Sequence, residues 1–436
     1  MTSKRNSSQS KGSLRRVLGK TTAMLLTAAM IIGTGLFAAL GESAEKAGAG
    51  LPLAIAIGGV IVLLVGLSAA SVGINIPEEG GGFTWSRKFG YPTIGFIAGC
   101  AYLGKGIVSS VVISLAFATY TAQAFEGLPP FAMHIMASAA VVAVAGLNYF
   151  GIEVNAKAAI GLLFVELLLL GIFIAFAAPA VRVEHLAPVL GNGVFGVLAG
   201  AAIFFWSWDG FMRMAIMASE VKDPPRTIPF AVVGGIAFAA VVFLIVAVTV
   251  LGVLGPDAMK GGGETASDTP LLTAGVKVLG QWGLWIVLAA AWIDTLTEAH
   301  GDMLTATRVA LAMGKGRELP AWLGAIHERT KSPRHAVLAL GVVCATLVLF
   351  LDLRPVLEIA NVFTLIWYCI VQFDALKLPR VKRLVPPWVT WLGLTGCVAL
   401  FASLPVWAVV AGIATLALVT ALRWLIRRFA TSPGPS

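Results

Sequence analysis

Two glycine-containing interruptions of apolar segments are the residues best suited to hold a small molecule. The first is Ile32-Gly33-Thr34-Gly35, and the second, Trp206-Ser207-Trp208-Asp209-Gly210, follows about 175 residues later. Glycine weakens a helix, and a broken backbone is tolerated in a membrane only where it lines a cavity or is buried in protein. Two interrupted spans in matching positions therefore predict the substrate site of a transporter.

A row of carboxylates is the second chemical feature. Asp294, Glu298 and Asp302 recur at every fourth position, which places them on one helical face over about 12 Å. Such a stripe is too costly to face lipid, so it must face the protein interior. His300 points elsewhere, and a packed, hydrogen-bonded role is predicted for it.

Single ionisable residues in other apolar segments add to this set. Glu166 lies in the middle of the apolar run 162–176, where it would exchange a proton during transport or hold a permanent ion pair with Lys105. Both alternatives stay open, and Glu166 joins Glu298 and Asp302 as a proton-coupling candidate. Asp209 and Arg213 are four residues apart, and this spacing predicts that they neutralise each other.

The elements that must position these residues are membrane-spanning helices. The chain is 58% apolar and 12% charged, with a mean hydropathy of +0.89, which places it in a bilayer. At about 20 apolar residues per spanning helix, about twelve spans are expected. They lie near residues 21–41, 51–73, 93–124, 131–149, 157–180, 194–218, 228–254, 282–312, 336–351, 355–376, 388–404 and 406–426.

The net charge of +9 invites an interaction with nucleic acid, but the distribution of the 31 Lys and Arg argues against it. Most lie in the N-terminal tail, the even-numbered loops and the C-terminal end. The opposite side holds few, namely Lys46, Arg182, Lys260, Lys277 and Arg354. The positive-inside rule then predicts a multi-pass protein of the cell membrane with both termini in the cytoplasm.

Catalytic and cofactor signals are weak. The four cysteines lie in apolar stretches without metal-ligand spacing, and Gly33-Thr34-Gly35 lacks the remainder of a nucleotide-binding loop. We expect no metal, no cofactor and no enzyme activity. Two alternatives stay open, an integral membrane enzyme that uses His300 with Asp302 on a lipid, and a sensor that binds a ligand without transporting it.

An internal repeat is suggested by sliding the chain on itself, because an offset near 175 residues lays Gly35 on Gly210. Three stretches also resemble the amino acid–polyamine–organocation superfamily of permeases. They are Ile31-Ile32-Gly33-Thr34-Gly35-Leu36-Phe37, Ser219-Glu220-Val221-Lys222-Asp223-Pro224-Pro225-Arg226-Thr227-Ile228-Pro229, and Ala306-Thr307-Arg308 through Arg317-Glu318-Leu319-Pro320.

The resemblance implies an all-α integral membrane protein of about twelve transmembrane helices. Its LeuT-like fold has two inverted repeats of five helices, with the first and sixth helices broken. The expected divisions are a cytoplasmic tail at 1–20, repeats at 21–180 and 190–376, two further helices at 377–429 and a disordered tail at 430–436.

The same resemblance implies how a substrate is held. The α-carboxylate of an amino acid would rest on Gly33, Thr34 and Gly35, and the amine on carbonyls of Ile203 to Ser207. Trp206 corresponds to an aromatic gate and Trp208 is a second candidate, with ordinary packing as the alternative for both. Lys105 borders the substrate from the third span, where it could be the counter-ion of the acid stripe. Ile32, Ser207, Asp209 and Gly210 complete the expected site.

The expected partners are an amino acid or related amine, the lipid bilayer and protons. The acid stripe favours a cationic substrate and Lys105 with Arg213 an anionic one, so the substrate charge stays open. Uniport, exchange and proton symport also stay open, as does the oligomeric state.

Overall fold

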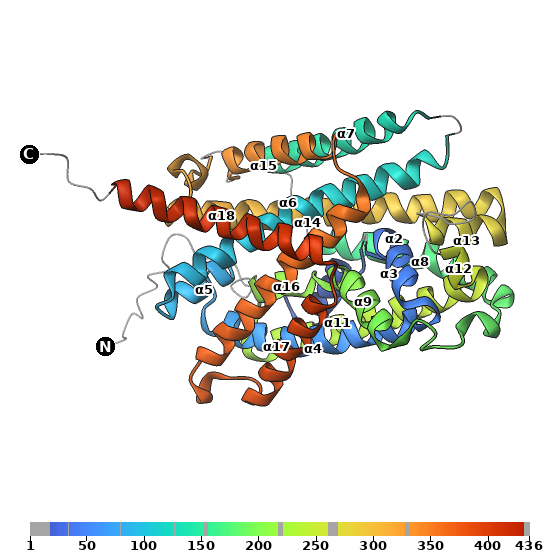
Figure 1. The fold of residues 1–436 in the computed structure, drawn as a ribbon, viewed down its shortest axis with the longest axis horizontal. Helices are drawn as coiled ribbons and strands as arrows, with labels where there is room; N and C mark the ends of the chain where they lie inside the picture. The colour runs from blue at the N-terminus through green and yellow to red at the C-terminus, as the bar shows by residue number, and fades with distance from the viewer. Residues whose placement is uncertain are drawn as a thin grey trace, which may run out of the picture.

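The computed structural model describes residues 18–33, 35–78, 80–125, 128–151, 156–216, 221–259, 269–327 and 332–430. Within these ranges the chain is helical, and its only β-type pairing is an isolated bridge between Leu18 and Val221 (Figure 1). Thr34, residues 217–220 and most of both predicted tails lie outside the described residues. The prediction of an all-α membrane protein is confirmed.

Each predicted span corresponds to a helix or a broken helix. The first is α1 (Lys20–Ile31), α2 (Gly35–Ala38) and α3 (Leu40–Ala47), and the sixth is α9 (Gly193–Phe204), the 3-10 turn η4 (Phe205–Trp208) and α10 (Phe211–Ile216). The others are α4 (Leu51–Asn75), α6 (Pro92–Ala122), α7 (Pro130–Tyr149), α8 (Ala156–Ala177), α11 (Pro224–Leu254), α14 (Gln281–Lys315), α15 (Arg334–Leu347), α16 (Leu353–Lys377), α17 (Pro387–Ala402) and α18 (Val406–Ala430).

Eight candidate spans among the described residues are long and apolar enough to cross a membrane. The segment formed by α9 and η4, together with α15 and α17, is apolar but shorter, and α14 carries the acid stripe. The count of about twelve spans therefore stays a prediction. Short helices α5 (Gly82–Lys88), α12 (Pro256–Met259) and α13 (Pro270–Leu279) lie between the longer ones.

The longest helices divide into inner and outer ones. The most apolar window of α16 is 72% buried and that of α6 is 67% buried, whereas that of α18 is only 11% buried. In the interior, α6 packs against both α14 and α16, and α8 packs against α14. Helix α1 packs against α11, and α4 packs against both α9 and α11. Both broken helices thus pack against long, unbroken ones.

Candidate functional site

The two interruptions predicted from glycine are present as breaks in helical geometry. α1 ends at Ile31, Ile32 has an extended backbone (φ −73°, ψ 106°), and the helix resumes at Gly35. α9 ends at Phe204 and gives way to the η4 turn, after which α10 starts at Phe211. Both breaks are buried, which is where a membrane protein tolerates irregular backbone.

Glycines bring the two breaks into contact. A β-carbon built on Gly35 would overlap the side chain of Ser207, and one built on Gly210 would overlap the backbone carbonyl of Met30 at the end of α1. Each broken helix therefore contributes a glycine that lets the other broken helix approach it closely. This close approach explains why both interruptions need a residue without a side chain.

Asn361 of α16 holds the second break in shape. Its Oδ1 accepts the backbone N–H of Trp206 at 2.8 Å, and its Nδ2 donates to the carbonyl oxygen of Ile203 at 2.9 Å. The Ile203 carbonyl, expected to bind a substrate amine, thus already accepts a hydrogen bond from the protein. The sequence analysis missed Asn361, because a lone amide in an apolar helix has no motif around it.

The two tryptophans of η4 have different surroundings. The indole Nε1 of Trp206 donates to Ser109 Oγ at 2.7 Å. Trp208 faces α4, where a β-carbon on Gly59 would lie 3.0 Å from its ring, and it stacks edge-on against Phe243 at 4.9 Å. The packing role that the sequence left open for Trp208 is the one this geometry favours.

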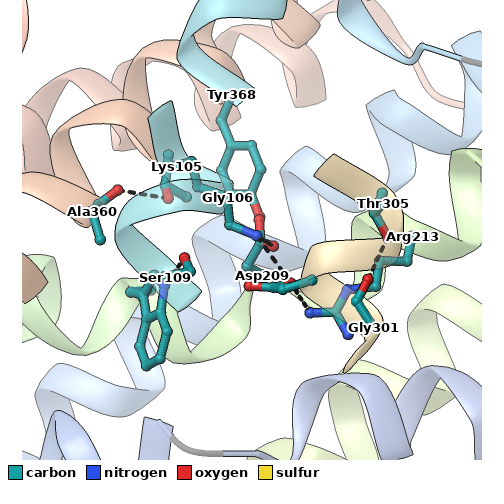
Figure 2. Close-up of polar contacts among 12 residues, drawn as sticks. Lys105, Gly106, Ser109, Asp209, Arg213, Gly301, Thr305, Ala360 and Tyr368 are labelled. Carbon is teal, nitrogen blue, oxygen red and sulfur yellow. Dashed lines mark hydrogen bonds and ion pairs between the residues drawn. The ribbon is translucent and has the colours of Figure 1, made fainter. Parts of the chain in front are cut away.

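A buried charge network lies beside the second break. Lys105 of α6 is hydrogen-bonded to Asp209 and lies 3.5 Å from Asp302 of α14, and Arg213 of α10 is hydrogen-bonded to Asp302. The hydroxyl of Tyr368 donates to Asp209 Oδ1 at 2.6 Å. Figure 2 shows Lys105 of α6 and Tyr368 of α16 converging on Asp209 and Arg213 of the second broken helix. All five side chains are nearly inaccessible.

One sequence prediction about these charges is wrong, and one alternative that the sequence left open is not the pairing observed. Asp209 and Arg213 were expected to neutralise each other, but each is bound instead by a partner from another helix. The predicted alternative of a permanent Lys105 pair with Glu166 is replaced by pairs with Asp209 and Asp302. The tertiary packing brings opposite charges closer than the spacing along one helix does. Two positive and two negative charges thus compensate one another.

The acid stripe runs from this network to the first break. Asp294 and Asp302 are buried, and a β-carbon on Gly33 would lie 2.5 Å from Glu298 Oε2 and 3.3 Å from Asp294 Oδ1. The burial of Asp294 and Asp302 agrees with the inference that the acid stripe faces the protein interior. His300 lies 3.2 Å from the amide of Asn148 on α7, in the packed role expected for it.

Glu166 of α8 lies on the other side of Glu298. Its side chain is 3% exposed, and its Oε1 has no hydrogen-bond partner among the described residues. The charge of Glu298 is close enough to repel it. Two carboxyl groups that approach each other between packed helices are costly to ionise together.

A cavity of about 420 Å³ lies between α3, α6, α7 and the start of α16. Glu42 lines it together with Ala38 and Asp352, and an ion pair of 2.9 Å between Glu45 and Arg354 lies beside it. The sequence analysis missed Glu42, because it ended the first span at residue 41 whereas α3 continues to Ala47. The cavity thus brings two carboxyl groups, Glu42 and Asp352, together with Arg354.

Comparison with known proteins identifies what the chain is similar to. The family model described as "Amino acid permease" matches residues 18–428. An uncharacterized transporter of Mycobacterium tuberculosis is 32% identical over 92% of this chain and 89% of its own length. The cationic amino acid transporter 7, chloroplastic, of Arabidopsis thaliana is 27% identical over 83% of this chain and 65% of its own length. The branched-chain amino acid permease BcaP of Bacillus subtilis is 25% identical over 86% of this chain and 83% of its own length.

Proposed function

Since the chain belongs to the amino acid permease family and is a membrane transporter of amino acids, we propose that it works by alternating access around its two broken helices. The glycine contacts between the breaks support this, because a movement of one broken helix is passed directly to the other. The excess of Lys and Arg near the chain ends supports cytoplasmic termini in a cell membrane.

The proposed architecture is two inverted repeats, residues 21–180 and 190–376, followed by two further helices within 377–429. A shift by five spans makes α6 equivalent to α14 and α16 equivalent to α8, so the α6–α16 contact corresponds to the α14–α8 contact. In the same way, the α1–α11 contact corresponds to the α9–α4 contact. Both members of each pair are present. This correspondence supports the repeat, because unrelated helices have no reason to pair twice in the same order.

In the proposed site, the substrate carboxylate rests on the amides of Gly33 to Gly35, and the amine is bound by carbonyls between Ile203 and Ser207. A half-helix start presents unpaired N–H groups and a positive dipole end, which suits a carboxylate. Trp206 is proposed to close over the substrate. Lys105, Asp209 and Arg213 are proposed to hold the site in shape through their ion pairs.

The proposed substrate class is cationic amino acids. The main support is that both buried cations, Lys105 and Arg213, are already paired with Asp209 and Asp302. Neither cation is then available to bind a negatively charged substrate side chain. Asp294 and Glu298 border Gly33, so a carboxylate bound there needs a nearby positive charge, which the side chain of a cationic amino acid would supply. Acidic surroundings stabilise a ligand with an extra positive charge. The relatives named as cationic amino acid transporters support the same class.

A competition assay in proteoliposomes tests this class. We expect excess arginine or lysine to reduce the uptake of labelled arginine by about tenfold, and leucine or glutamate to reduce it less than about twofold. Protein-free liposomes are the control. Equal competition by leucine would contradict the cationic class. Binding without uptake would instead indicate a sensor, and turnover of a lipid in detergent would indicate an enzyme.

We also propose that Glu166, with Glu298, couples transport to protons. Glu166→Gln should make uptake insensitive to an imposed pH gradient, because an amide keeps the shape of the side chain but cannot gain or lose this proton. Substrate binding by the purified variant should change less than about threefold. The measurement is uptake into proteoliposomes with and without an inward proton gradient.

The matched control is Glu184→Gln, which removes a carboxylate from the exposed turn η3 (Val183–Leu186). Its uptake should respond to the gradient as the unmodified protein does. A folded Glu166→Gln protein that still follows the gradient would exclude Glu166 and direct the search to Glu298. Asp302 is the weaker candidate, because Arg213 and Lys105 already hold its charge.

A further inference from the structure

An apolar groove runs along the outer helix α18 where it lies beside α6 (Figure 1). The groove measures about 620 Å³. Its lining comes from both helices, namely Ile97, Ile413, Leu416, Ala417, Thr420, Ala421 and Trp424. Because α18 is the least buried of the long apolar helices, this groove faces the lipid and not the protein interior.

The length of the groove corresponds to one lipid leaflet. From Ile413 to Trp424 the helix rises by about 16 Å, at about 1.5 Å per residue. Half of the hydrocarbon core of a bilayer is about 15 Å thick. Trp424 is 57% exposed at the far end, where tryptophan commonly marks the membrane interface.

Arginines gather immediately beyond that end. Arg87, Arg423 and Arg427 all bind the carboxylate of Glu318, with closest N–O distances of 2.7, 2.7 and 2.8 Å. Burial alone would raise the pKa of Glu318, but the hydrogen bonds and charges of these arginines lower it. Three arginines thus gather around one carboxylate, and a fourth, Arg428, lies 5.1 Å above the Trp424 ring.

We propose that the groove and these arginines form a binding site for an anionic phospholipid of the leaflet on the C-terminal side. One acyl chain occupies the groove, and the phosphate group contacts Arg427 and Arg428, which are both exposed. Guanidinium groups bind phosphate through paired hydrogen bonds, and basic clusters at the cytoplasmic ends of spans attract anionic lipids.

Charge favours a lipid over a second copy of the chain at this surface. A two-fold contact through α18 would place the same patch on both subunits, so each arginine cluster would face its own copy. An anionic phospholipid combines a negative headgroup, which matches the basic cluster, with an apolar chain, which matches the groove. The proposal is independent of the substrate and of proton coupling.

Native mass spectrometry of the full-length protein tests the site. The protein is purified in detergent, equilibrated with equal amounts of phosphatidylglycerol and phosphatidylcholine, and examined for retained lipid. We expect at least about fivefold more retained phosphatidylglycerol. The double variant Arg427→Gln with Arg428→Gln should lower it to the level of phosphatidylcholine. The control Arg380→Gln with Lys382→Gln removes two exposed charges from the turn η7 (Arg380–Lys382) and should retain it fully.

A second variant tests the groove separately from the charges. Ala417→Trp fills the groove from an exposed position, so it should reduce retention while Arg427 and Arg428 stay in place. If the double arginine variant fails to fold, this variant alone decides the outcome. Equal retention of both lipids, or unchanged retention in either variant, would overturn the proposal. A dimer that Ala417→Trp dissociates would assign the groove to a second copy instead.

Discussion

Gly210→Ala should reduce transport by about 100-fold, the loss typical of a misplacement of about 1 Å in a functional site. The new methyl group would overlap the backbone carbonyl of Met30, which cannot turn aside as a flexible side chain would. The two broken helices must then separate. The measurement is initial uptake into proteoliposomes, with thermal unfolding of the purified variant recorded in parallel. Gly35→Ala should act in the same way through Ser207.

Gly171→Ala is the matched control. Gly171 lies in the middle of α8, and a β-carbon there would have no atom within 4 Å. The control should transport normally and unfold at the same or a slightly higher temperature, because alanine favours the helix by about 1 kcal/mol. A Gly210→Ala protein with normal uptake would show that the breaks work without their contact.

Asp302→Asn should lower the free energy of unfolding by about 3–5 kcal/mol, the usual cost of removing one partner of a buried ion pair. Asp302 is bonded to Arg213 and lies 3.5 Å from Lys105, so its loss leaves a positive charge in a dry interior. Chemical unfolding in detergent measures the effect, with tryptophan fluorescence as the signal.

A second substitution distinguishes charge from packing. Asp302→Asn combined with Arg213→Met should recover most of the lost stability, because Lys105 keeps Asp209 and no unpaired guanidinium remains. Asp223→Asn is the surface control, since its pair with Arg226 is 3.9 Å long and exposed, and it should cost less than about 1 kcal/mol. An Asp302→Asn protein as stable as this control would refute the network's structural role.

The sequence was sufficient to predict the helices and their breaks. A membrane span is recognised by its length and apolarity, and both are local properties that neighbouring helices do not change. The breaks were visible because glycine weakens the helix wherever it packs. The first span was nevertheless ended too early, since Glu42 looks like a loop residue when the burial of α3 is unknown.

Most partners within the site could not be predicted in the same way, although the resemblance placed Lys105 near the acid stripe and it lies 3.5 Å from Asp302. The spacing rule for helical charges selects a partner on the same helix, so it paired Asp209 with Arg213. Their actual partners, Lys105 and Asp302, come from helices far apart in the sequence, and only packing brings them together. Asn361 was missed for a related reason, because its importance lies in the break that it faces and not in its own helix.

The two hydrogen bonds of Asn361 also determine when the entropy of the broken helix is lost. An unwound turn held only by a ligand would lose its backbone freedom at each binding event, at about 1–2 kcal/mol per ordered residue. Asn361 instead fixes the turn from Ile203 to Trp206 when the protein folds. In the proposed site, the segment would meet its substrate already ordered, so binding would proceed without that recurring entropic loss.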